Sequence, residues 1–438
     1  MTETSDPRLV DADEDVAWDA DVHPPGLVPP SGPKHAQYRR SSSRLGGGAF
    51  GEVLAGRRLA TGEPVALKRV VVRAPDEGIP DNLLRELKTL QHLSGRSPHV
   101  VRLLDHYPLG NAVVLVLELC PRGDLRSLLG VGAAGADPRE GRDPRAHLPL
   151  TPACVKGVVR QVFMGLAACH SLGVIHRDVK PGNVLVGADA RLKLADFGLA
   201  RFAPGTSPGT RTSSPRPSSP RPSSPSPGVL FGTYTPAIQT RWYRAPEILY
   251  GARDYSAAVD VWSAGAILAE LLPPNGPILP GDSDIDQLAR TLTLLGTPDD
   301  ARWPDARGLP DYEKIAFAPR LPTPPRDALP GNVDPGLATD FLFRALALDP
   351  KTRPTAEEAL RDEYFRAAPA AASPEAALEE LRRCALRGDG DFGGGTERPR
   401  GRSGEGGGTR AEVAEGDFRD ALVALGLDGE LEGSRRDG

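Results

Sequence analysis

The spacing of hydrophobic residues predicts strands in the first part of this chain. Residues 64–72 (PVALKRVVV) alternate between two faces, whereas residues 112–119 (AVVLVLEL) are continuously apolar, as in a strand covered on both sides. One helix interrupts these strands, because residues 81–93 (DNLLRELKTLQHL) place three leucines on one face. The pattern therefore indicates a small β-rich block that carries one main helix.

From about residue 150 onwards the hydrophobic spacing becomes helical. Residues 151–173 carry an apolar stripe that starts with a Thr-Pro cap and ends at a glycine. Residues 256–272 (SAAVDVWSAGAILAELL) are apolar almost all round, which predicts a buried helix. Short strands at 184–186 and 192–194 flank a polar turn. The sequence thus predicts an α+β protein with a small β-rich lobe and a larger, mainly helical lobe.

Composition marks segments that do not belong to this core. Residues 1–37 are acidic and rich in proline and glycine, so we expect a disordered leader. Residues 366–438 return to Ala, Gly, Arg and Glu and are expected to form a mostly disordered tail, with one short amphipathic helix at 412–427. The Ser/Pro tract, residues 212–228 (TSSPRPSSPRPSSPSPG), is either a linker between two domains or an insertion within one.

The totals argue against several classes of protein. A net charge of −5 with mixed signs gives no basic stripe for a phosphate backbone, so nucleic acid is not an expected partner. The four cysteines lack metal-ligand spacing and are too sparse for a disulfide framework, which suits a reducing compartment. No window reaches the roughly 18 apolar residues of a membrane span, and no signal peptide is evident. We therefore expect a protein of the cytoplasm or nucleus, without a membrane partner.

A glycine-rich segment at residues 45–53 (LGGGAFGEV) fits a G-x-G-x-x-G-x-V frame. A glycine run alone is usually a turn, but the next segment here is a strand, whereas a dinucleotide-binding fold would continue with a helix. Because alternate strand residues share a face, Ala66 should point towards a flat base and Lys68 towards its phosphates. A buried lysine needs a carboxylate, and Glu86 on the leucine-rich helix is placed to supply it.

Two polar motifs follow in the helical part of the chain. Residues 176–183 (HRDVKPGN) contain Asp178, Lys180 and Asn183. Asp196 opens a later Asp-Phe-Gly segment. Each motif could be an ordinary turn, but all of these polar positions together with the strand lysine are not expected by chance.

These motifs resemble those of the eukaryotic protein kinases over residues 38–365, which implies the bilobal protein kinase fold. The resemblance implies an N-lobe at 38–119 and a C-lobe at 121–365. A Ser/Pro insertion, residues 203–229, then lies between the Asp-Phe-Gly and Ala-Pro-Glu motifs. Because of this position it belongs to the activation segment of one catalytic domain and is not a linker between domains. A surface loop tolerates such added length at little entropic cost.

The resemblance also implies a role for each candidate residue. Asp178 would accept the proton of the attacking hydroxyl, and Lys180 would steady the transferring phosphoryl group. Asn183 and Asp196 would hold Mg²⁺. Lys68 and Glu86 complete the catalytic set, and a structural pair is expected between Glu247 and Arg353. The residues expected to bind ATP are Leu45, Gly46, Gly47, Gly48, Ala49, Phe50, Gly51, Glu52, Val53, Ala66, Lys68, Glu118, Cys120, Asp124 and Leu185.

The segment before Glu247 narrows the resemblance. A lysine two positions after Asp178 is similar to the serine/threonine kinases, and residues 234–247 (YTPAIQTRWYRAPE) resemble the cyclin-dependent and MAP kinase group. In that group Thr240 and Arg244 would shape the pocket that receives a proline after the acceptor, which implies proline-directed phosphorylation. A phosphate on Thr235 would gather three arginines and order the segment. These arginines, which could instead form ordinary salt bridges, are Arg85, Arg177 and Arg201.

Residues 250–272 and 284–317 most resemble the cell cycle-related kinase branch of the cyclin-dependent kinase group, which implies a cell-cycle or ciliary role and adds the cilium to the expected locations. Expected partners are protein substrates with Ser/Thr-Pro sites, an upstream activating kinase and a cyclin-like activator, although IPDNLLRE replaces the cyclin-binding PSTAIRE. Ala49 and Phe50 stand where cell-cycle members carry inhibitory Thr and Tyr, so that brake should be absent.

Two other interpretations stay open from the sequence. A MAP-kinase-like member is disfavoured because Thr235 is followed by Pro-Ala, without a tyrosine two residues on. A kinase-shaped scaffold without turnover would usually lack Lys68, Asp178 or Asp196, and all three are present. The four Ser-Pro sites of the Ser/Pro tract are expected either to be phosphorylated and tune access to Thr235, or to form a neutral insertion or a polyproline surface.

Overall fold

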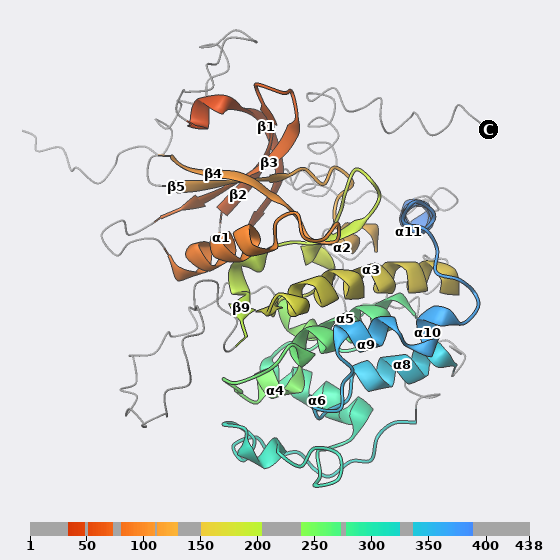
Figure 1. Ribbon diagram of the computed structural model, residues 1–438. Coiled ribbons are helices and arrows are strands. Elements are labelled where there is room, and N and C mark those ends of the chain that lie inside the picture. Colours follow the sequence, from red (N-terminus) through yellow and green to blue (C-terminus); the bar gives the residue numbers. More distant parts are fainter. Residues whose placement is uncertain are drawn as a thin grey trace, which may run out of the picture. The chain divides into compact units, whose positions relative to one another are not determined.

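The computed structural model describes eight stretches of the chain, namely residues 34–48, 51–72, 80–109, 112–129, 150–203, 238–272, 277–324 and 336–388 (Figure 1). Within these stretches no helix has the length and apolar character needed to cross a membrane. For Thr240 the structure describes the backbone and not the side chain. Predictions that lie outside the described residues concern the leader up to residue 33, Ala49, Phe50, the Ser/Pro tract, Thr235 and the helix at 412–427.

The described chain forms two compact units, and the first is built on a five-stranded antiparallel sheet in the order β1-β2-β3-β5-β4 (Figure 1). Its two faces differ in character. Val65 and Leu67 of β3 pack with Tyr107 and Val114 in an apolar core, whereas Lys68 belongs to the opposite set of side chains. The strands predicted at 64–72 and 112–119 are β3 and β5, each one residue shorter than expected. The five strands are β1 (Tyr38–Gly48), β2 (Gly51–Arg58), β3 (Pro64–Val71), β4 (Leu103–Leu109) and β5 (Ala112–Glu118).

A short 3-10 helix, η1 (Lys34–Gln37), precedes the sheet and corrects the expected end of the leader. The Nζ of Lys34 lies 2.6 Å from Oδ1 of Asp105 on β4 and also donates to the carbonyl of His106 at 3.2 Å. The Tyr38 hydroxyl donates to Asp105 as well, and its ring stacks on Tyr107 with centroids 5.7 Å apart. The ordered first unit therefore begins at least four residues before the boundary that composition suggested.

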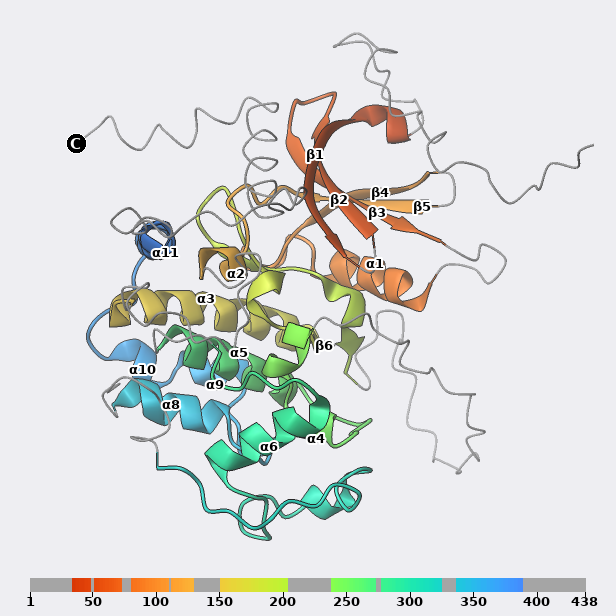
Figure 2. The same cartoon turned by 180° about the vertical axis from the view of Figure 1, so that it is seen from behind.

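The second unit is mainly helical, and α3 (Pro152–Ser171) runs through it as the sequence predicts. The Thr151 side chain caps the first turn by accepting from the Cys154 amide at 3.3 Å, and Gly173 leaves the helix with a φ of +70°. The predicted apolar helix is α5 (Ala258–Leu271), which is buried along nearly its whole length. Helices α3, α5 and α8 (Leu337–Ala345) follow one another as packed layers (Figures 1 and 2).

Smaller elements complete the second unit, and the predicted strands β7 and β8 pair antiparallel. Helix α1 (Asp81–Leu93) has the predicted bounds, buries Leu83 and Leu90, and crosses the division between the two units. The remaining elements are α2 (Leu125–Leu128), β6 (Val174–Ile175), η3 (Pro181–Asn183), β7 (Val184–Val186), β8 (Leu192–Leu194), η4 (Phe197–Leu199), β9 (Arg201–Phe202), η5 (Ile238–Tyr243), α4 (Pro246–Leu249), α6 (Asp284–Leu295), η6 (Ala306–Gly308), α9 (Ala356–Leu360) and α10 (Glu363–Arg366).

A further helix, α11 (Pro374–Gly388), lies in the region where composition predicted a mostly disordered tail. It packs against α3 and α2, as both views of the second unit show (Figures 1 and 2). Its inner side buries Leu378, Leu381 and Cys384. The first part of the expected tail is therefore an ordered part of the second unit.

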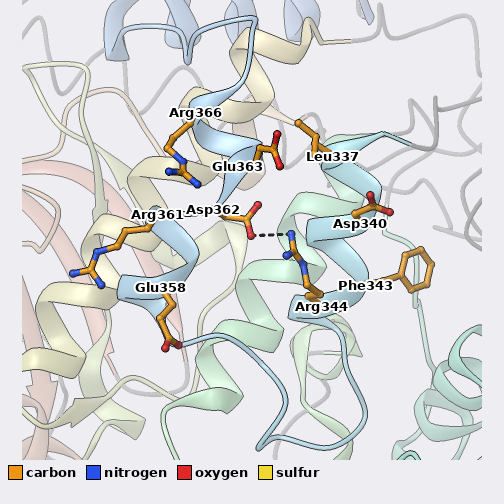
Figure 3. A pocket seen from close by; sticks show the side chains of 9 residues that line it. All are labelled: Leu337, Asp340, Phe343, Arg344, Glu358, Arg361, Asp362, Glu363 and Arg366. Carbon is orange, nitrogen blue, oxygen red and sulfur yellow. Dashed lines mark ion pairs between the residues drawn. The ribbon is translucent and has the colours of Figure 1, made fainter.

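A surface cleft of about 710 Å³ opens at α8, α9 and α10 (Figure 3). Its lining is largely charged, and Arg344 of α8 pairs with Asp362 at 2.8 Å within it (Figure 3). Neither the residues predicted to bind ATP nor those predicted to hold a metal line this cleft.

Candidate active site

The glycine-rich segment forms the hairpin between β1 and β2. Gly48 lies opposite Gly51, and Gly46 lies opposite Val53. Gly51 has a φ of +147°, and a Cβ on it would lie 2.0 Å from the carbonyl oxygen of Arg69, so a side chain cannot be accommodated there. Leu45 and Val53 are half-buried, and Gly47 pairs with Glu52 across the hairpin.

Lys68 sits in the middle of β3, opposite Val53 on one side and Leu115 on the other. Ala66 is cross-strand partner to Ala55, which packs with Leu45 and Leu119. Because residues two apart in a strand share a face, the half-buried Lys68 belongs to this same small-residue face, as predicted.

The remaining residues that are predicted to bind ATP lie outside the hairpin and β3. The carboxylate of Glu118, at the end of β5, accepts from the Arg102 backbone amide at 2.9 Å and from its Nε at 3.2 Å. In the second unit Asp124 caps α2 by accepting from the amide and the hydroxyl of Ser127, both at 2.7 Å. Asp124 also forms an isolated β-bridge with Leu185, and Cys120 is a half-buried cysteine that is not part of a disulfide.

The HRDVKPGN segment brings its three predicted residues together. The Lys180 ammonium donates to Oδ2 of Asp178 at 2.7 Å, and the Asn183 amide donates to the same oxygen at 2.9 Å and to the Asp178 carbonyl at 2.8 Å. Asp178 is half-buried and Asn183 is 7% exposed. The Asp178 carboxylate is therefore fixed by one cation and one amide, as a positioned base requires.

A buried carboxylate that the sequence interpretation missed supports this segment. Asp260 of α5 is fully buried and accepts from the backbone amides of His176 at 2.8 Å and Arg177 at 2.7 Å, and it contacts Nε2 of His170 at 2.8 Å. Burial alone would raise the pKa of Asp260, but the hydrogen bond from His170 and the neighbouring histidines outweigh it and hold the pKa below the ordinary value. The available signal was that the largely apolar stretch 256–272 contains acids, Asp260 and Glu270.

The Asp-Phe-Gly segment lies beside the HRDVKPGN segment and beside α1. Asp196 adopts a left-handed φ of 63°, and Phe197 is fully buried against the His176 ring, with centroids 4.6 Å apart. A Cβ placed on Gly198 would lie 3.5 Å from an oxygen of Asp196 and 3.9 Å from an oxygen of Glu86. Glu86, which is 4% exposed, is therefore close to the Asp-Phe-Gly segment within the second unit.

The chemistry of these groups fits a hard divalent cation. The amide nitrogen of Asn183 is committed to Asp178, which leaves its side-chain oxygen as the acceptor on the other side. The backbone carbonyl of Asn183 accepts from the Ala195 amide at 2.9 Å, which links the loop to the residue before Asp196. A carboxylate and an amide oxygen are ligands that Mg²⁺ prefers. Within the described stretches no group of three His, Cys, Asp or Glu side chains offers a competing metal site.

The three predicted regulatory arginines gather in the second unit. Arg85 donates to the Gly198 carbonyl at 3.4 Å and Arg177 to the Leu199 carbonyl at 3.1 Å. Arg201 donates to a carbonyl at 3.4 Å, and Arg177 and Arg201 both lie over the Tyr255 ring. Burial lowers the pKa of Arg177, and the positive charges of Arg201 and Arg85 lower it further. In the described part of the chain no carboxylate forms an ion pair with any of these three arginines.

The segment that ends at Glu247 is held from several sides. Arg244 lies 3.7 Å from Oδ1 of Asp284 at the start of α6, and Arg241 contacts the same oxygen at 3.2 Å. The predicted structural pair is confirmed, because Arg353 donates to both oxygens of Glu247 at 2.7 and 2.8 Å.

Comparison with known proteins identifies the family. The family model for the protein kinase domain matches residues 39–365. The chain belongs to the protein kinase family. This kinase is 40% identical over 333 residues to cyclin-dependent kinase 20 of Mus musculus, which covers 76% of this chain and 84% of that protein. It is 37% identical to cyclin-dependent kinase D-1 of Arabidopsis thaliana, over 75% of this chain and 71% of that protein.

The fold of this kinase is also similar to that of a solved structure. It is described as the CAK complex from Chaetomium thermophilum bound to ATP-γ-S, and it matches with a TM-score of 0.61 and 32% identity, over 77% of this kinase and 94% of that chain. The kinase is a serine/threonine kinase of the cyclin-dependent kinase group, which confirms the predicted family and fold, and as such it binds ATP. The expected branch is confirmed by the likeness to cyclin-dependent kinase 20.

Proposed function

We propose that this kinase transfers the γ-phosphoryl group of ATP to Ser or Thr residues that precede proline. The observation that carries the proposal is the Asp178 carboxylate, fixed by Lys180 at 2.7 Å and by Asn183 at 2.9 Å. This carboxylate would accept the proton of the substrate hydroxyl as the new bond to phosphorus forms, and Lys180 would place a positive charge beside the transferred group.

The remaining residues bind and orient the nucleotide in this proposal. Lys68 would contact its phosphates and pair with Glu86. Asp196 and the side-chain oxygen of Asn183 would hold Mg²⁺, which neutralises phosphate charge when it is bound.

The preference for proline rests on the segment before Glu247. Arg244 is anchored by the carboxylate of Asp284 at 3.7 Å, and Thr240 lies four residues before it in the same segment. We expect these residues to shape the pocket for the residue that follows the acceptor.

Phosphorylation of Thr235 by an upstream kinase is the proposed activating step. Arg85, Arg177 and Arg201 now donate to backbone carbonyls, and burial together with the charges of Arg201 and Arg85 lowers the pKa of Arg177. A phosphate would relieve this mutual repulsion through charge-assisted hydrogen bonds and so order the segment. A cyclin-like activator that binds α1 would act on Arg85 and Glu86, since both lie on that helix. The expected cell-cycle or ciliary role stays a prediction.

The test is phosphate transfer to paired peptides that differ only in Ser-Pro or Ser-Ala. The wild-type kinase should favour Ser-Pro in kcat/KM by about tenfold or more, which corresponds to about 1.4 kcal/mol. Asp178→Asn should lower kcat about 10²- to 10⁴-fold without changing the melting temperature. Thr235→Ala should prevent activation by an upstream kinase. Equal rates on the two peptides would refute the proline preference, and an active Asp178→Asn variant would refute the role of that carboxylate.

A further inference from the structure

The segment that follows the matched kinase domain, residues 366–373, packs against α3 through specific contacts. Lys156 is 3% exposed and donates to the carbonyls of Ala367 at 2.6 Å and Pro369 at 2.7 Å. Gly157 lets the same segment approach closely, because a Cβ there would lie 2.7 Å from the carbonyl oxygen of Ala372. The segment can therefore pack on α3 in one position. That position gives the buried lysine its two carbonyl partners and places the glycine where the backbones come closest.

Helix α11 then contacts Thr151, the N-cap residue of α3. The Glu380 carboxylate accepts from the Thr151 backbone amide at 2.5 Å and from the Thr151 hydroxyl at 2.8 Å. Leu378 and Leu381 are 4% and 1% exposed beside this contact. The position of α11 therefore depends on an apolar seam and on one carboxylate that needs the Thr151 hydroxyl as a donor.

Thr151 also has the features of a phosphate acceptor for a proline-directed kinase. It precedes Pro152, it is exposed, and its backbone is extended with φ −63° and ψ 149°. In the described part of the chain five Ser/Thr residues precede proline, and only Thr151 and Ser373 are exposed. The other three are partly buried and have hydroxyl hydrogen bonds within the fold: Ser97, Thr297 and Thr323.

We propose that Thr151 is a phosphorylation site for a proline-directed kinase, and that its phosphate displaces Glu380 and undocks α11. In this step the Thr151 oxygen forms a bond to the γ-phosphorus of ATP, the bond from that phosphorus to the β–γ bridging oxygen breaks, and ADP leaves. The hydroxyl proton passes to the base of the acting kinase. Where that kinase is a second copy of this chain, the proposal rests on the proposed function above.

The displacement follows from the charges at the contact. Phosphorylation removes the Thr151 hydroxyl, which is one of the two donors to Glu380, and puts a charge of about −1.5 to −2 beside the carboxylate. The phosphate can keep accepting from the Cys154 amide, as the Thr151 hydroxyl does now, so the phosphothreonine should stay at the start of α3 and the carboxylate should leave. Burial raises the pKa of the Cys154 thiol, whereas the nearby positive charge of Arg383 lowers it. Arg383 is therefore the cation that could bind the phosphate and so oppose the displacement.

Undocking of α11 should affect the residues expected to bind ATP, because α2 connects the two. Helix α11 packs against α2 as well as α3. The residue that caps α2 is Asp124, which bridges to Leu185, and both are among the residues expected to bind ATP. Loss of this support should raise the KM for ATP more than it lowers kcat, because the groups around Asp178 are not touched.

The displacement is tested in the full chain with phosphothreonine placed at position 151 during synthesis, and with Asp178→Asn so that the chain's own activity plays no part. Hydrogen exchange of the α11 amides should become about tenfold faster or more. Phosphoserine at position 373, the other exposed site, should not produce this loss of protection. Combining phosphothreonine 151 with Glu380→Gln should keep α11 protected, because the glutamine amide can donate to the phosphate.

Three results would overturn the displacement: unchanged protection, increased protection through capture of the phosphate by Arg383, or equal loss in the Glu380→Gln protein. The acceptor assignment is tested by treating the Asp178→Asn chain with a proline-directed kinase and ATP and mapping the phosphates. Modification of Thr151 with Thr297 unmodified is expected, and modification of Ser373 without Thr151 would refute it. Failure of the wild-type chain to phosphorylate a Ser-Pro peptide would refute only the proposed function, since neither test uses its activity.

Discussion

Removing one partner of the buried Glu247–Arg353 pair should destabilise the second unit strongly. The side chains are 4% and 0% exposed, and the guanidinium donates to both carboxylate oxygens. Arg353 also donates to the carbonyls of Ala347 at 2.8 Å and Leu348 at 3.1 Å, and it lies over the Trp262 ring, 4.9 Å from its centroid. A variant at either position therefore leaves a buried charge or buried carbonyls without their partners.

The expected size follows from this geometry. Breaking a buried ion pair costs about 3–5 kcal/mol. At about 2–4 °C per kcal/mol for a unit of a few hundred residues, Glu247→Gln should lower the melting temperature by about 6 °C or more. Arg353→Met should lower it further, because the carbonyls also lose their donor. The measurement is thermal unfolding followed by circular dichroism, at one protein concentration and without nucleotide.

A matched control separates this effect from general sensitivity to charge removal. Lys351 and Asp305 form an ion pair with side chains that are 74% and 64% exposed, so Lys351→Met should leave the melting temperature close to that of the wild type. The double variant Glu247→Gln/Arg353→Met should lose less than the sum of its single variants, since it leaves no unpaired charge. The reasoning is refuted if Glu247→Gln melts as close to the wild type as Lys351→Met does.

Two further predictions concern the residues that shape the site. Asp260 has a folded pKa below 3.8, so the stability it contributes is present above about pH 4 and is lost as the pH falls through the folded pKa. Asp260→Asn should therefore reduce the free energy of unfolding at pH 7, and its difference from the wild type should shrink on acidification in pH-dependent denaturant melts. Gly51→Ala should weaken nucleotide binding by about tenfold or more, because a Cβ would meet the Arg69 carbonyl at 2.0 Å, and calorimetric titration with ATP would show it. An affinity equal to that of the wild type would contradict this steric argument.

The sequence predicted the elements whose pattern is local. Strand β3 and helix α3 were found because alternation and the Thr-Pro cap act over a few neighbouring residues. Asp178, Lys180 and Asn183 were also singled out, because all three lie in one eight-residue segment, and the structure adds their contacts with one another. Glu247–Arg353 was expected by resemblance and is present.

The sequence interpretation failed where composition hid a local signal or where contacts come from distant segments. The Ala-Glu-Arg composition after residue 366 suggested disorder, although Ala377, Leu378, Leu381 and Cys384 repeat with helical spacing after a Ser-Pro start. That stripe could have revealed α11, but its partner surface on α3 could not be predicted, because it lies more than 200 residues away.

Asp260 explains why the HRDVKPGN segment keeps a conformation that its own residues do not favour. Arg177 has a φ of 71° and Asp196 a φ of 63°, and each left-handed residue costs about 1–3 kcal/mol unless its surroundings hold it. The Arg177 amide is held by the Asp260 carboxylate at 2.7 Å, and Phe197 packs on His176 next to Asp196. The energy that fixes the loop thus comes from an acid in α5 and a buried ring. Helix α5 therefore supports the proposed catalytic base, because it sets the backbone from which Asp178 projects.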